Sequence, residues 1–155
     1  MRSAALQHSY PVIPPAPRAA TRGHGVARVA RLAGRAAYLE ITAFAHGATA
    51  RHTVTSALRQ IADAPAIILD LRRHRGGEET MASFITSCFF ATEPMALERF
   101  ALCPGKPAAG AGVPRLLSAT IDILVSRETS ALGRGFAANL KRLGRARVVG
   151  PAPKR

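Results

Sequence analysis

Apolar and polar positions recur along the chain with two different periods, and each change of period marks a new element. Apolar and basic side chains alternate over residues 26–32, and after a turn at Gly34 an apolar-rich run follows at 37–44. This pattern predicts two strands joined by a tight turn. Over residues 49–64 the apolar side chains recur every three or four positions, which predicts an amphipathic helix that Pro65 ends.

Strand and helix patterns continue to alternate after Pro65. The short apolar run at 66–69 closes on Asp70 and predicts a buried strand. Residues 92–120 are rich in proline and glycine, so we expect mostly a long loop there. Between the two, after a glycine pair, a second helix is predicted from apolar residues with helical spacing: Met81, Phe84, Ile85, Cys88 and Phe89.

A further strand and helix follow the loop. Residues 121–125 form an apolar run that predicts a strand, and residues 147–149 begin another. The order β-β-α-β-α-β-α-β favours an α/β fold with a mixed or parallel sheet covered by helices. The helix between these strands is predicted from Leu132, Phe136, Ala137, Leu140 and Leu143.

Length and composition set the number of domains. The chain has 155 residues, of which 48% are apolar and 20% charged, as expected for one packed domain. Residues 1–25 contain many prolines, arginines and glycines without periodicity. We therefore expect a disordered or loop-like arm at 1–25, the domain at 26–150 and a short tail at 151–155.

The net charge of +13 raises the question of nucleic-acid binding. The arginines are spread along the whole chain without a basic block, and the sequence has no tryptophan and 2 tyrosines. Because specific nucleic-acid binding needs clustered cations and stacking aromatic rings, we expect none. A nucleic-acid-binding protein nevertheless stays open as an alternative on charge alone.

Neither cysteines nor histidines are spaced for a metal site. Cys88 and Cys103 are too few for a disulfide framework, and the histidines lack ligand spacing, so we expect no cofactor and surface or loop roles for most histidines. No apolar stretch approaches the length of a membrane span, and the first residues lack the apolar core of a signal peptide. These features predict a cytoplasmic chain without a membrane span.

The segment from Ile67 to Gly77 carries most of the candidate chemistry. A buried strand that runs into a glycine turn at a helix start leaves backbone N–H groups without partners, which is how proteins hold an oxyanion or a phosphate. Gly76 and Gly77 are therefore the candidate donors. Asp70, at the end of the strand, is a candidate supporting residue, and capping of the turn is an equally good interpretation.

This segment resembles the tail-specific (C-terminal processing) serine peptidase family, in the branch of interphotoreceptor retinoid-binding protein. The similarity rests on Asp70-Leu71-Arg72, Gly76-Gly77, Phe89-Phe90 and the strand at 123–129, and it extends over about residues 24–150. The resemblance implies a truncated crotonase or ClpP-like fold of stacked β-β-α units. It also implies a serine-type peptidase that acts on peptides or proteins, and family relatives are often exported.

The resemblance also implies where the chain departs from the family. An alignment without gaps places Ala131 where the family has its nucleophilic serine, and Ser130 takes that role only if the register shifts by one residue. Arg73, His74 and Arg75 replace the family's Asp, Asn and first Gly, and the segment expected to supply the general base is missing. We therefore expect an impaired or incomplete peptidase-like domain.

Two other functions stay open at this point. The same fold could hold a peptide or an apolar ligand without catalysis, as the retinoid-binding branch suggests. The chain could also be the product of a truncated or decaying gene, whose exposed strand edges would promote aggregation.

Overall fold

The structure of the protein, a computed structural model, describes residues 23–91 and 113–151. The predicted N-terminal arm therefore lies almost wholly outside the described residues. The same holds for most of the predicted loop at 92–120 and for residues 152–155 of the predicted tail. The proposed domain limits stay a prediction.

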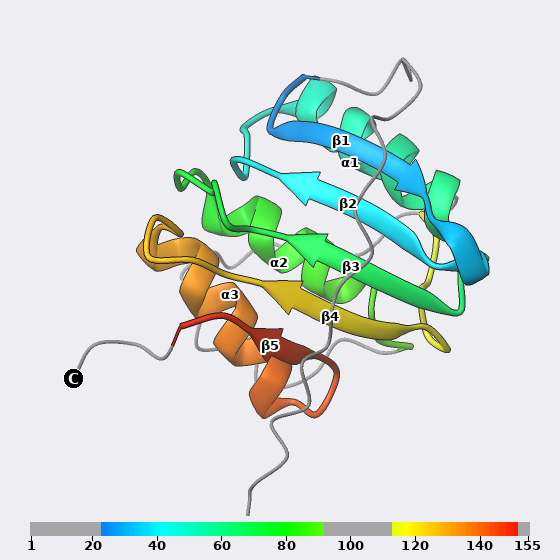
Figure 1. The fold of residues 1–155 in the computed structure, drawn as a ribbon. Helices are drawn as coiled ribbons and strands as arrows, with labels where there is room; N and C mark the ends of the chain where they lie inside the picture. The colour runs from blue at the N-terminus through cyan, green and yellow to red at the C-terminus, as the bar shows by residue number, and fades with distance from the viewer. Residues whose placement is uncertain (1–22, 92–112, 152–155) are drawn as a thin grey trace, which may run out of the picture.

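A five-stranded sheet carries the fold (Figure 1). β1 is antiparallel to β2, and the other three neighbouring pairs are parallel. The predicted mixed α/β architecture is thus confirmed. In chain order, which is also the order across the sheet, the strands are β1 (Val26–Arg31), β2 (Ala37–Ile41), β3 (Ala66–Asp70), β4 (Thr120–Leu124) and β5 (Arg147–Val149).

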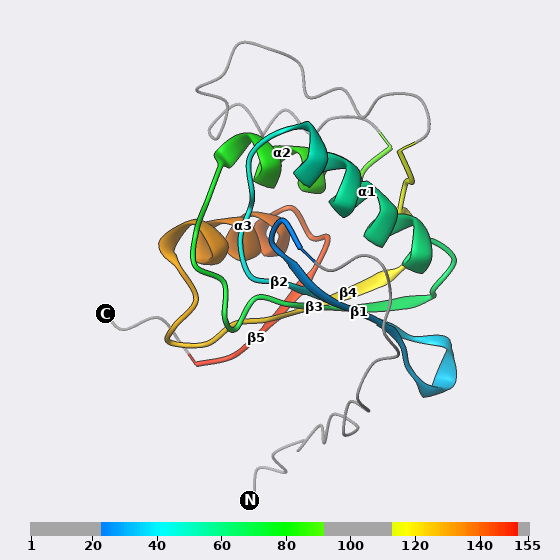
Figure 2. The same ribbon diagram turned by 90° about the horizontal axis from the view of Figure 1, so that it is seen from above.

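Three helices connect the parallel strands, and all three lie on the same face of the sheet (Figure 2). They are α1 (Ala48–Ile61), α2 (Glu79–Ser87) and α3 (Ala131–Arg142). None of the helices in the described ranges is both long enough and apolar enough to cross a membrane.

Alternation along the strands separates two clusters of buried side chains. In β2, Ala37, Leu39 and Ile41 are buried in the large core under the helices. Tyr38 and Glu40 point to the opposite face, where a small apolar cluster of Ala30, Tyr38, Ile68 and Leu124 lies. The helix-free face is therefore part apolar and part charged, and its charged residues include those at the carboxyl ends of β2 and β3.

The second strand is shorter than the pattern predicts. It ends at Ile41, and Phe44 leaves the sheet to form an isolated parallel bridge with Gly77. The Phe44 N–H donates to the Gly76 carbonyl at 2.9 Å, and the Glu78 N–H donates to the Phe44 carbonyl at 2.8 Å. This departure fixes the glycine turn against the segment that precedes α1.

Candidate functional site

The glycine turn between β3 and α2 is held on both sides by backbone hydrogen bonds. The Arg75 N–H donates to the Thr42 carbonyl at 2.8 Å, in addition to the two bonds with Phe44. Gly76 and Gly77 have φ values of +115° and +128°. A Cβ on Gly77 would lie 2.1 Å from the Phe44 carbonyl oxygen, so this position requires glycine for space as well as for conformation.

Ser130 and His74 come together beside this turn. The Ser130 hydroxyl lies 2.8 Å from Nδ1 of His74, and the Ser130 N–H donates to the His74 carbonyl at 2.8 Å. The Gly76 N–H donates to the same Nδ1 at 3.3 Å. Because Nδ1 accepts from Gly76, the imidazole proton sits on Nε2, and the Ser130 hydroxyl donates to Nδ1.

Ser130 is also the N-cap of α3. Its Oγ accepts from the Gly133 N–H at 3.1 Å, which satisfies one of the free donors of the first helical turn. Ala131 is the first residue of α3 and is exposed. The structure therefore places both candidate positions for the nucleophile at the start of one helix, and Ser130 is the one whose side chain faces the glycine turn.

His74 is fully buried, contrary to the surface or loop role that the sequence suggested for most of the histidines. Its ring packs against Phe44, with the ring centres 4.2 Å apart. Nε2 is buried and has no hydrogen-bond partner among the described residues. Because burial disfavours the charged form, the pKa of His74 falls to about 4. The imidazole is neutral at pH 7.

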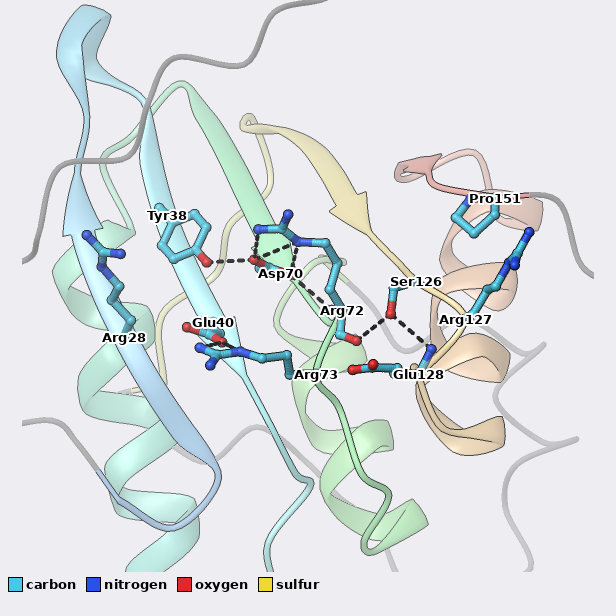
Figure 3. Close-up of a pocket in the computed structure, with 10 residues that line it drawn as sticks. All are labelled: Arg28, Tyr38, Glu40, Asp70, Arg72, Arg73, Ser126, Arg127, Glu128 and Pro151. Atoms are coloured by element: carbon cyan, nitrogen blue, oxygen red, sulfur yellow. Dashed lines mark hydrogen bonds and ion pairs between the residues drawn. The ribbon is translucent and has the colours of Figure 1, made fainter.

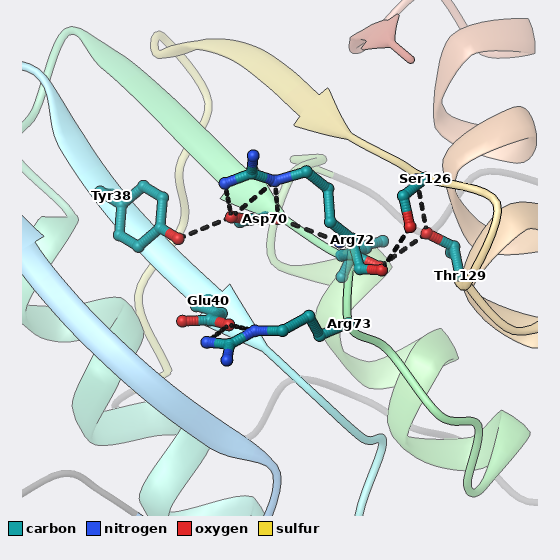
Figure 4. A network of polar contacts seen from close by, with 8 residues as sticks. Tyr38, Glu40, Asp70, Arg72, Arg73, Ser126 and Thr129 are labelled. Carbon is teal, nitrogen blue, oxygen red and sulfur yellow. Dashed lines mark hydrogen bonds and ion pairs between the residues drawn. The ribbon is translucent and has the colours of Figure 1, made fainter. Parts of the chain in front are cut away.

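Asp70 belongs to a different polar network, which it forms with Tyr38 and Arg72 (Figure 4). Tyr38 donates to Oδ2 of Asp70 at 2.6 Å, and the Arg72 guanidinium donates through Nε and Nη2, the latter at 2.7 Å. Burial alone would raise the pKa of Asp70, but the hydrogen bonds from Arg72 and Tyr38 outweigh it and lower the pKa. The Arg72 N–H also donates to Oδ1 at 2.9 Å, the turn-capping contact that the sequence left open.

The structure brings most of the candidate site residues together but leaves one of them in a different network. Ser130, Gly76 and Gly77 lie around His74, whereas Asp70 belongs to a second polar network. No group of three or more potential metal ligands occurs within the described part of the chain. The sequence did not point to His74 as a partner of Ser130, because 56 positions separate the two residues.

Known protein structures share this fold. A candidate peptidase from Parabacteroides merdae matches with a TM-score of 0.59 at 15% identity, over 82% of this chain and 43% of its own. A candidate S41 protease from Bacteroides fragilis matches with a TM-score of 0.58 at 15% identity, over 83% of this chain and 38% of its own. The photosystem II D1 C-terminal processing protease matches with a TM-score of 0.51 at 15% identity, over 80% of this chain and 33% of its own. The chain thus spans less than half the length of these proteins.

The comparison of the sequence with family models gives the assignment. No curated protein matches the chain. The model of peptidase family S41 matches residues 35–154, which include β2 to β5, the glycine turn and Ser130. The predicted resemblance is confirmed: this chain belongs to peptidase family S41.

Proposed function

We propose that the chain is a serine-peptidase-like domain that holds a peptide or protein segment at the glycine turn and does not complete acyl transfer by itself. One observation carries this proposal: the Ser130 hydroxyl is fixed between the Gly133 N–H and a buried imidazole whose Nε2 has no hydrogen-bond partner among the described residues. Attack on a carbonyl would require this hydroxyl to leave its capping role and to give its proton to His74.

His74 is poorly suited to take that proton. A general base works best when its pKa lies near the working pH, and burial holds the pKa of His74 at about 4. In serine–histidine–aspartate sites a carboxylate on the far nitrogen stabilises the imidazolium. Nε2 of His74 has no such group in the described residues, so protonation would create a buried, unpaired cation.

The predicted oxyanion donors are only partly available. The Gly76 N–H donates to His74, so it is already engaged. The Gly77 N–H has no acceptor within residues 23–91 or 113–151. A site with one free donor can bind a peptide carbonyl, but it gives less stabilisation to a tetrahedral intermediate than a pair of donors, each of which contributes about 3 kcal/mol in an intact peptidase.

An active serine peptidase is the second candidate function, and the Ser130–His74 distance favours it. At 2.8 Å the hydroxyl and the imidazole are within the range of a nucleophile and its base. In that case Ser130, rather than the position of Ala131, would carry the nucleophile.

A fluorophosphonate probe separates the two functions, because it labels only serines that are activated for attack. The purified chain is incubated with the probe beside a serine peptidase as positive control, and adducts are mapped by peptide mass spectrometry. We expect no adduct on Ser130 while the control is labelled. An adduct on Ser130 that Ser130→Ala removes would establish the active peptidase and overturn our proposal.

The binding part of the proposal has its own test. A mixture of unstructured peptides is added to the ¹⁵N-labelled chain, and amide resonances are followed together with peptide mass. We expect shifts at the Gly76 and Gly77 amides without loss of intact peptide. Unchanged glycine amides with every peptide would contradict a peptide-binding turn.

A further inference from the structure

A second site lies on the helix-free face of the sheet. A pocket lies at the carboxyl ends of β2 and β3, and Figure 3 shows the residues that line it. Its volume is about 780 Å³. Arginines and carboxylates dominate its lining, which also includes Tyr38 and Ser126. Its lining holds four arginines (Arg28, Arg72, Arg73 and Arg127) and three carboxylates (Glu40, Asp70 and Glu128), so the pocket carries a formal excess of one positive charge.

Two of the arginines hold buried carboxylates in the same way. Arg72 donates to Asp70 through Nε and Nη2, at 3.1 Å and 2.7 Å to Oδ2. Arg73 donates to Oε1 of Glu40 through the same two nitrogens, with Nε at 2.8 Å. The Asp70 and Glu40 side chains are only 3% and 6% exposed. The Nε and Nη2 edge of an arginine is thus the carboxylate-binding edge on this face.

Arg28 presents that same edge without a carboxylate. Its Nε and Nη2 are buried, and neither has a hydrogen-bond partner among the described residues. The guanidinium lies beside the Tyr38 ring, with 5.7 Å from Cζ to the ring centre, and Tyr38 in turn donates to Asp70. A buried guanidinium edge without an acceptor is costly, and a carboxylate supplied by a ligand would remove this cost.

We propose that this pocket binds a small monocarboxylate, and that the Arg28 side chain turns its buried Nε and Nη2 edge toward the carboxylate group when the ligand binds. The excess of one positive charge matches one negative charge, so a monoanion fits better than a phosphate dianion. The remaining Nη1 groups of Arg72 and Arg73 have no acceptor among the described residues and can contact polar atoms of the same ligand. This site is independent of the peptidase-like function.

The test compares an acid with its uncharged amide. N-acetylalanine and N-acetylalaninamide are titrated separately into the ¹⁵N-labelled chain, and the arginine Nε–H resonances and the Tyr38 amide are followed by NMR. We expect saturable shifts at Arg28 and Tyr38 with the acid and none with the amide. Equal shifts with both compounds would overturn the proposal, and this comparison needs no variant.

Variants then locate the carboxylate. Arg28→Gln should weaken binding of the acid by about tenfold or more, because a bidentate charge-assisted contact is lost. Arg28→Lys keeps the positive charge but loses the planar pair of N–H donors, and should recover only part of the affinity. Lys141→Gln, an equal charge change on α3, should leave the affinity unchanged. If Arg28→Gln binds like Lys141→Gln, or if inorganic phosphate binds more tightly than the acid, the assignment is wrong.

Discussion

The Ser130 hydroxyl donates to Nδ1 of His74 across 2.8 Å, which ties the start of α3 to the turn before α2. The backbone reinforces this contact, since the Ser130 N–H donates to the His74 carbonyl. The pair thus forms a tertiary contact between two parallel β-α units, which we call the Ser130–His74 contact. Its contribution to stability can be measured whether or not Ser130 ever acts as a nucleophile.

Ser130→Ala should lower the free energy of unfolding by about 1–2 kcal/mol. The substitution removes the cap on the Gly133 N–H and leaves Nδ1 of His74 with one donor fewer. Urea denaturation followed by circular dichroism measures the change. Ser118→Ala, at an exposed serine, should stay within about 0.5 kcal/mol of the unchanged chain. Equal free energies of unfolding for the two variants would show that the Ser130–His74 contact does not stabilise the fold.

Stability should rise with pH between about 4 and 6.5 because of His74. Burial lowers the pKa of His74 from 6.5 to about 4, so in this window the unfolded chain binds a proton that the folded chain does not. The contribution is fully present above pH 6.5 and is lost as the pH falls to about 4. A shift of this size corresponds to at most about 3 kcal/mol.

Urea denaturation at several pH values checks this dependence, with two variants for comparison. His74→Gln cannot titrate and should flatten the slope in that window. His52→Gln, at an exposed position of α1, should keep it. A slope that persists in His74→Gln would assign the pH dependence to other groups.

The elements of the fold could be predicted because each has a local signature. The helical spacing from Ala50 to Ile61 and the apolar run at 67–69 lie within one element each, and both were found at the predicted places. The glycine turn could be located as well, since Gly76 and Gly77 directly follow a strand and precede a helix. The strands lie in the sheet in chain order, as expected of successive parallel β-α-β units.

The site could be predicted only in part, because its decisive contacts are long-range. Nothing near His74, which stands between Arg73 and Arg75, indicates burial, and its shielding by Phe44 depends on the early end of β2. The location of the Asp70 side chain on a face without helices depends on the arrangement of the whole sheet and its helices. Alternation puts it opposite Leu69, but only the placement of all three helices on one face shows that this side is free of helices.

The two glycines of the turn should respond differently to alanine. Both have positive φ, so each substitution strains the backbone by about 1–3 kcal/mol. A Cβ at Gly76 meets no atom within 4 Å, whereas at Gly77 it would lie 2.1 Å from the Phe44 carbonyl oxygen. We expect Gly77→Ala to be destabilised by at least about 2 kcal/mol more than Gly76→Ala in urea denaturation. Similar losses would mean that the bridge to Phe44 is not maintained in solution.

The Tyr38–Asp70 pair should be coupled in a double-mutant cycle. Tyr38→Phe removes one hydrogen bond and should cost about 1 kcal/mol, whereas Asp70→Asn also unbalances the charge of Arg72 and should cost more. The double variant should lose less free energy of unfolding than the sum of the two single variants, by at least about 0.5 kcal/mol, because the residues share one network. Strict additivity would contradict the 2.6 Å contact.

Acid titration gives a second, independent measure of the same network. The pKa of Asp70 is held below its usual range, so the ionised carboxylate contributes stability that is present above a pH of about 4 and is lost as the pH falls further. Asp70→Asn should therefore remove part of the loss of stability below pH 4 and leave the window from 4 to 6.5 unchanged, since that window belongs to His74. If Asp70→Asn reduced the pH dependence of stability in both windows, the titrations of Asp70 and His74 would be coupled.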